Sequence, residues 1–98
     1  MWAQVIKSRA KPGKEEEIRN LPQEFEAMGG MPQFLHLFAC SNQNDPSEHY
    51  TFVVFESEEA ARANERTPEQ DRRVERMREL YEGEPEFVDL DVVYNRSR

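Results

Sequence analysis

Histidine and cysteine are the rarest reactive residues of this chain, and His36 has the most suggestive neighbours. It lies in a short apolar run, where the alternation of a strand places its side chain on the same face as Phe34 and Phe38. Imidazole accepts and releases protons near neutral pH, so this pattern predicts a proton acceptor in a cavity lined by aromatic rings. The alternative is a partly buried histidine whose nitrogens are satisfied by hydrogen bonds.

His49 and Cys40 form the second candidate pair. Counting outward from a turn centred near Asn44 places them close together across a hairpin. Zinc is usually held by three or four protein ligands, and the sequence offers two here. We therefore expect no metal site.

Three further groups have both a chemical and a structural interpretation. Trp2 offers a flat surface on which a ligand could stack, but it suits a core or dimer contact equally well. Asp89 and Asp91 share a face of the last strand, which suits either paired-carboxylate chemistry or solvated charges that discourage edge aggregation. An arginine-rich stretch has acidic residues at helical pairing distance, which favours a solvated helix face over an anion site. Its arginines are Arg72, Arg73, Arg76 and Arg78.

The composition limits the classes of partner. The chain has 98 residues, the size of one domain with a thin core, and we treat residues 1–98 as that domain. The net charge of −7, with basic residues interleaved among acidic ones, argues against nucleic acid. No apolar run approaches the roughly 18 residues that a membrane span needs. With a single cysteine and no signal-peptide pattern, we expect a cytoplasmic protein.

The elements that must position these residues follow from local patterns. Four runs rich in apolar, aromatic and β-branched residues predict strands. They cover residues 2–10, 34–40, 49–55 and 87–94. Apolar residues at spacings of three and four predict a first helix that ends at Gly29-Gly30 and is interrupted near Asn20 and Pro22. A second helix is expected to begin after Ser57, restart after Thr67 and end at Gly83.

This order predicts an α+β domain with the ferredoxin-like βαββαβ arrangement, in which two helices cover one face of a four-stranded antiparallel sheet. The third strand is apolar on both sides. Tyr50, Phe52 and Val54 lie on one face, and Val53 and Phe55 on the other. Because the helices cover only one face, we expect a second copy of the chain to cover the other and to leave a cavity, as in a homodimer.

Three stretches of the chain resemble the antibiotic biosynthesis monooxygenase family. They are the first strand running into Lys11-Pro12-Gly13-Lys14, the strand and helix junction at residues 54–60, and Thr67-Pro68-Glu69. The resemblance implies a dimeric α/β barrel. It also implies one of three activities: oxygen-dependent oxidation of phenolic or quinol-like compounds without a metal or flavin, haem degradation, or no catalysis.

Specific residues separate these activities. The haem-degrading branch of the family uses an asparagine in the first strand, a tryptophan before the Glu-Ser that ends the third strand, and a histidine in the second helix. This chain has no asparagine in its first strand, Phe55 at the tryptophan position and no histidine in the second helix. Other members carry a histidine near the place of Asn64. Haem degradation of that kind is therefore disfavoured, and the missing histidine also counts against the oxygenase.

The combined prediction is a homodimer whose cavities each accept a small aromatic or quinone-like molecule, with no cofactor. As an enzyme it would be a cofactor-independent monooxygenase with His36 as the catalytic proton acceptor. The residues expected to contact the ligand are Trp2, Phe34, Phe38, Phe55 and Asn64. One alternative is a non-catalytic binding or accessory dimer of the same fold, and another is a solid core without a cavity.

Overall fold

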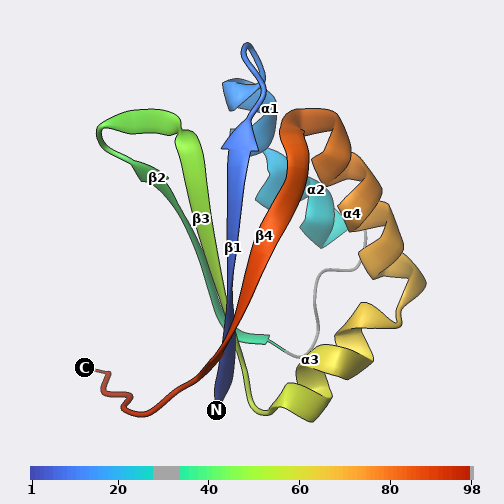
Figure 1. The fold of residues 1–98 in the computed structure, drawn as a ribbon. Helices are drawn as coiled ribbons and strands as arrows, with labels where there is room; N and C mark the ends of the chain where they lie inside the picture. The colour runs from blue at the N-terminus through green and yellow to red at the C-terminus, as the bar shows by residue number, and fades with distance from the viewer. Residues whose placement is uncertain (28–33, 98) are drawn as a thin grey trace.

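The computed structural model describes residues 1–27 and 34–97, and it shows one sheet beside a layer of helices (Figure 1). The elements in chain order are β1 (Trp2–Ala10), α1 (Glu15–Arg19), α2 (Leu21–Ala27), β2 (Phe34–Asn42), β3 (Asp45–Phe55), α3 (Glu58–Glu65), α4 (Pro68–Leu80) and β4 (Tyr81–Asp91). The strands pair antiparallel in the order β2-β3-β1-β4. The predicted α+β, ferredoxin-like fold with a four-stranded antiparallel sheet is confirmed.

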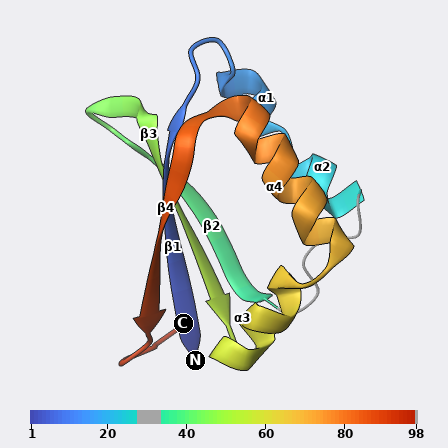
Figure 2. The same cartoon turned by 45° about the vertical axis from the view of Figure 1, so that its right-hand side comes forward.

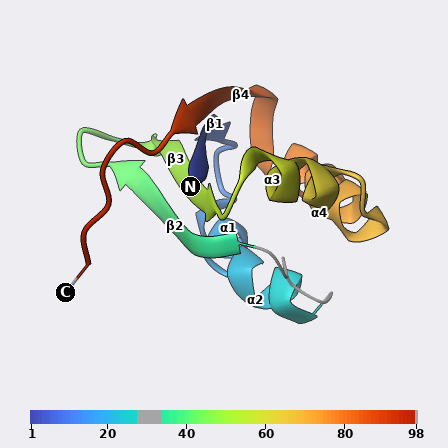
Figure 3. The same cartoon turned by 90° about the horizontal axis from the view of Figure 1, so that it is seen from below.

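All the helices lie on the same side of the sheet (Figures 2 and 3). We call this side the covered face and the opposite side the open face. Directly paired residues of neighbouring strands share a face. Gln4, for example, pairs with Val53 on the covered face, and Val5 pairs with Phe52 on the open face. None of the helices in the described parts of the chain is long and apolar enough to cross a membrane.

Side-chain caps explain where the second helical segment starts and breaks. The Ser57 hydroxyl accepts a hydrogen bond from the backbone N–H of Ala60 at 3.1 Å, which begins α3. The Thr67 hydroxyl accepts one from the N–H of Gln70 at 3.2 Å, and Pro68 follows at the first helical position of α4. The predicted break at Thr67 is confirmed.

The first helical segment is also broken where expected. α1 ends at Arg19 and α2 begins at Leu21, so Pro22 lies in the first turn of α2, where its missing amide removes no helical hydrogen bond. The predicted end at Gly29-Gly30 lies outside the described residues.

The hairpin between β2 and β3 is longer than predicted. β2 extends to Asn42 and β3 begins at Asp45, rather than stopping at Cys40 and starting at His49. The turn is closed by the Asn42 side-chain oxygen, which accepts a hydrogen bond from the N–H of Asn44 at 2.9 Å. The β2–β3 ladder therefore continues through polar residues up to the turn, because the Asn42 side chain supplies the hydrogen bond that closes it.

The boundary between α4 and β4 was predicted wrongly. The helix ends at Leu80 instead of Gly83, and β4 covers Tyr81–Asp91 instead of residues 87–94. Tyr81 pairs with Ala10 of β1, and the N–H of Lys11 donates to the Leu80 carbonyl at 2.9 Å. Because of these contacts with β1, β4 begins directly after the last residue of α4. Gly83, at φ +62°, lies beside a register shift in the β1–β4 ladder.

Among the described residues, two small clusters of buried apolar side chains lie at opposite ends of the covered face. One contains Trp2, Val53, Phe55 and Ala61. The other contains Ala10, Leu21, Leu80 and Tyr81. Since Trp2 and Ala10 are the first and last residues of β1, the middle of the strand lies between the two clusters.

Candidate functional site

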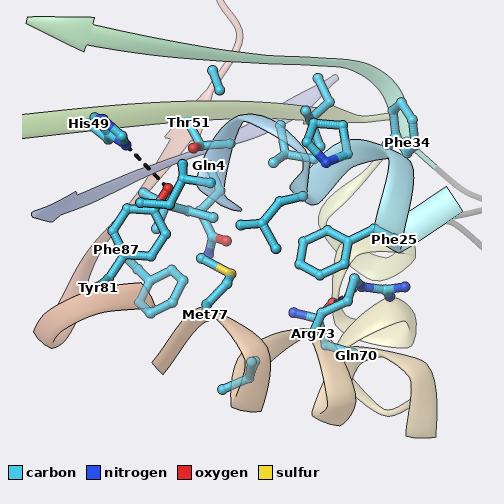
Figure 4. A pocket seen from close by; sticks show the side chains of 18 of the residues that line it. Gln4, Phe25, Phe34, His49, Thr51, Gln70, Arg73, Met77, Tyr81 and Phe87 are labelled. Carbon is cyan, nitrogen blue, oxygen red and sulfur yellow. Dashed lines mark hydrogen bonds between the residues drawn. The ribbon is translucent and has the colours of Figure 1, made fainter. Parts of the chain in front are cut away.

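A cavity of about 810 Å³ lies between the covered face and the helices. Drug-sized ligands occupy cavities of roughly 300–1,000 Å³, so this one is large enough for a molecule with several rings. Most of its wall is apolar. Two groups of polar side chains, His49 with Tyr81 and Gln70 with Arg73, lie at opposite ends, and Gln4 and Thr51 lie between them (Figure 4). Phe34 and Leu37 line it although they are 39% and 37% exposed. The cavity therefore opens to solvent beside β2.

One polar end is formed by His49 of β3 and Tyr81 of β4 (Figure 4). The His49 Nδ1 atom lies 3.2 Å from the Tyr81 hydroxyl, and the His49 Nε2 atom lies 3.0 Å from the Pro46 carbonyl oxygen. A carbonyl oxygen can only accept, so Nε2 carries the hydrogen in the neutral ring and Nδ1 accepts from the Tyr81 hydroxyl. Burial raises the pKa of Tyr81, so its phenol stays protonated near neutral pH.

The other polar end combines two amides with a guanidinium group. Asn64 of α3 and Arg73 of α4 are buried, at 7% and 3% exposure. The Arg73 Nε–H donates to the Gln70 side-chain oxygen at 3.0 Å, and a terminal Arg73 nitrogen donates to the Asn64 side-chain oxygen at 3.4 Å. Burial lowers the pKa of Arg73, and the nearby charge of Glu69 opposes that shift. This end therefore carries the positive charge of Arg73, held by hydrogen bonds to the two amides.

Of the residues predicted to contact a ligand, Phe34, Phe55 and Asn64 line the cavity. Trp2 is buried in the neighbouring core cluster, with its ring centroid 6.2 Å from that of Phe55. The guanidinium of Arg62 lies over the Trp2 ring, 5.2 Å from its centroid. The structure thus places Trp2 behind the cavity wall, where it positions Phe55.

His36 and Phe38 lie on the open face. Phe34 pairs with Phe55 on the covered face, but the register shifts before His36, which pairs with Val54. The prediction that His36 shares a face with Phe34 is therefore wrong, because an irregularity in β2 interrupts the strict alternation. His36 does share a face with Phe38, which stacks on Phe52 with ring centroids 5.0 Å apart.

The second candidate pair is separated by the pleat of the sheet. His49 pairs with Ser41, next to Cys40, whereas Cys40 itself pairs with Tyr50 on the open face. Within residues 1–27 and 34–97, no group of three or more histidine, cysteine, aspartate or glutamate side chains is placed to hold a metal ion.

The Asp89 carboxylate accepts two side-chain hydrogen bonds. Their donors are the Gln4 side-chain amide and the Arg62 guanidinium, each at 2.9 Å. The Gln4 hydrogen bond, followed by the Arg62 one, lowers the pKa of Asp89. These contacts favour the structural interpretation of Asp89 over paired-carboxylate chemistry with Asp91.

The arginines of α4 do not form one solvated face. Arg72 and Arg78 are exposed, but the prediction is wrong for Arg73, which faces inward. Arg76 contacts Glu17, Glu24 and Glu79 at 2.8–3.3 Å, so it ties α4 to α1 and α2.

Sequence reasoning missed Tyr81 and Arg73 as cavity residues, and it considered His49 only as a metal ligand. The available signal was weak. Tyr81 continues the apolar stripe of α4, so the local pattern predicts a helical residue although Tyr81 is the first residue of β4.

The open face carries an apolar surface. Its side chains include His36, Phe38, Phe52, Val54 and Leu90. Phe38 is 52% exposed and Leu90 is 38% exposed.

Comparison with known proteins agrees with this architecture. Residues 1–76 match the family model described as antibiotic biosynthesis monooxygenase. No curated protein sequence matches the chain.

Solved structures share the fold at low sequence identity. A crystal structure of an antibiotic biosynthesis monooxygenase is 19% identical with a TM-score of 0.77, covering 96% of this chain and 100% of its own. A Mycobacterium tuberculosis protein is 13% identical with a TM-score of 0.78, covering 98% of both chains. A Nitrosomonas europaea protein of unknown function is 17% identical with a TM-score of 0.78, covering 99% of this chain and 93% of its own. At these identities the likeness is one of fold.

Proposed function

Because the chain belongs to the antibiotic biosynthesis monooxygenase family, we propose that it binds a small aromatic or quinone-like molecule and oxidises it as a cofactor-independent monooxygenase. The observation that carries this proposal is the cavity of about 810 Å³, which is apolar over most of its wall and has a group of hydrogen-bonded polar side chains at each of two ends. Such a cavity suits a flat, multi-ring molecule with a polar substituent at one or both ends.

The reaction requires few chemical steps to be performed by the protein itself. When dioxygen converts a methylene between aromatic rings into a carbonyl, one oxygen atom enters the substrate and the other leaves as water with the two methylene hydrogens. The substrate supplies the electrons once it has lost a proton. The protein must therefore hold the substrate, accept that proton and limit the access of water.

A homodimer is part of the proposal. In the part of the chain that the structure describes, no helix covers the aromatic and aliphatic side chains of the open face, because the helices all pack on the covered face. A second copy packing sheet against sheet would bury Phe38 and Leu90 and would complete the barrel implied by the family. His36 would then lie between the two sheets, separate from the cavity.

The second candidate function is non-catalytic binding by the same dimer. Asn64 favours it, since an amide stands on the cavity wall near the place where other family members carry a histidine. An amide can orient a ligand by hydrogen bonding but cannot take up a proton near neutral pH.

Oxygen uptake tests the two candidates. Purified protein is mixed in air with a panel of quinols and anthrone-type phenols, and the Ala39→Trp variant, which fills part of the cavity wall, is the control. The oxygenase predicts uptake by the wild type and its loss in Ala39→Trp. Binding without uptake supports the non-catalytic function, and neither binding nor uptake contradicts both.

His36→Ala refines the result. If this variant loses uptake while its dimer remains intact, the substrate is oxidised beside His36 between the two sheets instead of in the cavity. Unchanged uptake assigns the proton transfer to the cavity.

A further inference from the structure

We propose that Tyr81 and His49 act as one proton-accepting pair on the cavity wall: a ligand hydroxyl donates to the Tyr81 oxygen, and Tyr81 passes its own proton to His49 Nδ1. This inference rests on the proposed function in one respect, because it needs an aromatic ligand in the cavity. It assigns the proton step to residues of β3 and β4 instead of to the second helix or to His36.

The direction of transfer follows from the hydrogen bonds. Since the Pro46 carbonyl holds the hydrogen on Nε2, the lone pair of Nδ1 faces the Tyr81 hydroxyl at 3.2 Å. The Tyr81 oxygen then has its own lone pairs left to accept from a ligand. His49 and Tyr81 both line the cavity, and their rings meet edge to face with centroids 5.6 Å apart.

The proton count of the step is balanced. The O–H bond of the ligand breaks and an O–H bond to the Tyr81 oxygen forms, while the original Tyr81 proton moves to Nδ1. The products are a ligand oxyanion, an intact phenol and an imidazolium. Both N–H groups of that imidazolium have acceptors, the Pro46 carbonyl and the Tyr81 oxygen.

The two sheet neighbours of His49 are uncharged. In the sheet His49 is flanked by Ser8 of β1 and Ser41 of β2, and neither carries a positive charge that would repel an imidazolium. Because burial raises the pKa of Tyr81, the phenol relays a proton rather than standing as a phenolate.

Other polar groups of the cavity are less suited to this step. The Asn64 and Gln70 amides and the Arg73 guanidinium donate hydrogen bonds or position charge, but they do not accept protons near neutral pH. The carboxylates on the cavity wall are exposed to solvent, unlike the buried Tyr81 phenol. They are Glu15, Glu26, Glu65 and Asp71.

A matched ligand pair tests the inference. The probes are 2-hydroxyanthraquinone and 2-methoxyanthraquinone, in which a methyl group replaces the hydrogen that Tyr81 would receive. Binding is followed by ligand absorbance, whose long-wavelength band also reports the ionised hydroxyl. We expect the wild type to bind the hydroxyl compound about three to ten times more tightly than its ether, the range for one neutral hydrogen bond.

Two variants separate recognition from proton uptake. Tyr81→Phe keeps the ring that packs in the core, and we expect it to lose the preference for the hydroxyl compound while the affinity for the ether stays unchanged. His49→Gln keeps an acceptor for the Tyr81 hydroxyl but takes up no proton, so we expect the preference to remain and the ionised band to disappear. Tyr94→Phe, at a residue that is 76% exposed, is the matched control.

The possible outcomes separate a failure of the Tyr81–His49 pair from a failure of the proposed function. Equal affinities of the wild type for the two probes, with binding of both blocked by Ala39→Trp, would overturn the pair and leave the binding function standing. An ionised band that persists in His49→Gln would also overturn it. If neither probe bound, the proposed function would fail and the inference with it. Circular dichroism of each variant checks folding, and His49→Gln carries the test if Tyr81→Phe does not fold.

Discussion

Both faces of the sheet carry apolar side chains, but the two faces differ in how these side chains are covered and in the polar groups beside them. The covered face carries two small core clusters, and its polar groups are held in place by hydrogen bonds, as in the contact of His49 with Tyr81. The open face carries exposed aromatic and aliphatic side chains, with Phe38 stacked on Phe52.

This difference shows how a thin domain can hold a cavity. Counting residues 1–27 and 34–97, each core cluster contains four buried residues, so the helices are held at the two ends of β1 while the middle stays hollow. Within the described residues, every buried side-chain nitrogen and oxygen has a hydrogen-bond partner. The buried polar groups of the covered face are therefore satisfied within one chain, whereas the open face is the surface that the proposed second copy would bury.

Removing a side chain from the core between the covered face and the helices should have the largest effect. Leu80 is fully buried, at 0% exposure, so Leu80→Ala should lower the free energy of unfolding by about 2–5 kcal/mol. Urea denaturation measures this. Val93→Ala, at a residue that is 94% exposed, should change it by less than about 0.5 kcal/mol. Equal losses in both variants would contradict the assignment of the core.

A charge on the open face should break assembly and leave the fold intact. Phe38→Glu places a carboxylate where the proposed dimer packs, and we expect the dissociation constant to rise about 100-fold because that charge would be buried without a partner. Sedimentation equilibrium measures this, and circular dichroism should be unchanged. Val93→Glu, which adds the same charge at an exposed residue, is the control. An unaltered oligomeric state in Phe38→Glu would place any interface elsewhere.

The corner between α3 and α4 holds the amide and guanidinium end of the cavity. The Thr67 hydroxyl accepts from the Gln70 N–H and donates to the Asn64 carbonyl at 2.9 Å. Thr67→Ala should therefore cost about 1 kcal/mol of stability in thermal or urea unfolding, and Thr67→Ser should retain most of it. A serine variant as unstable as the alanine variant would show that the hydroxyl is not the stabilising group.

The smallest expected effect is a pH dependence at the edge of the covered face. The hydrogen bonds from Gln4 and Arg62 hold the pKa of Asp89 below 3.8, so the ionised carboxylate stabilises the fold at higher pH. The stability gained is lost as the pH falls through the lowered pKa of the folded state. The gap in unfolding free energy between the wild type and Asp89→Asn should thus be constant near neutral pH and should shrink below about pH 4.

Urea denaturation at several pH values measures that gap. Asp91→Asn removes an equal charge from the same strand and serves as the control. A gap that widens on acidification would contradict the assigned contacts of Asp89.

The sequence by itself determined the order of elements, the capped starts at Ser57 and Thr67 and the doubly apolar third strand, because alternation, capping and turn chemistry act over a few neighbouring residues. Of the five residues expected to contact a ligand, Phe34, Phe55 and Asn64 line the cavity beneath the helices, although the cavity was expected from the sequence to lie between two copies of the chain.

Only the tertiary structure decided what this cavity can do. A register shift in β2 turned His36 to the open face, and pairing with β1 drew Tyr81 from the end of a helix stripe into β4. Its hydroxyl thereby meets His49, which lies 32 residues earlier in the chain. These outcomes depend on contacts between distant segments, and the period of a local pattern carries no information about them.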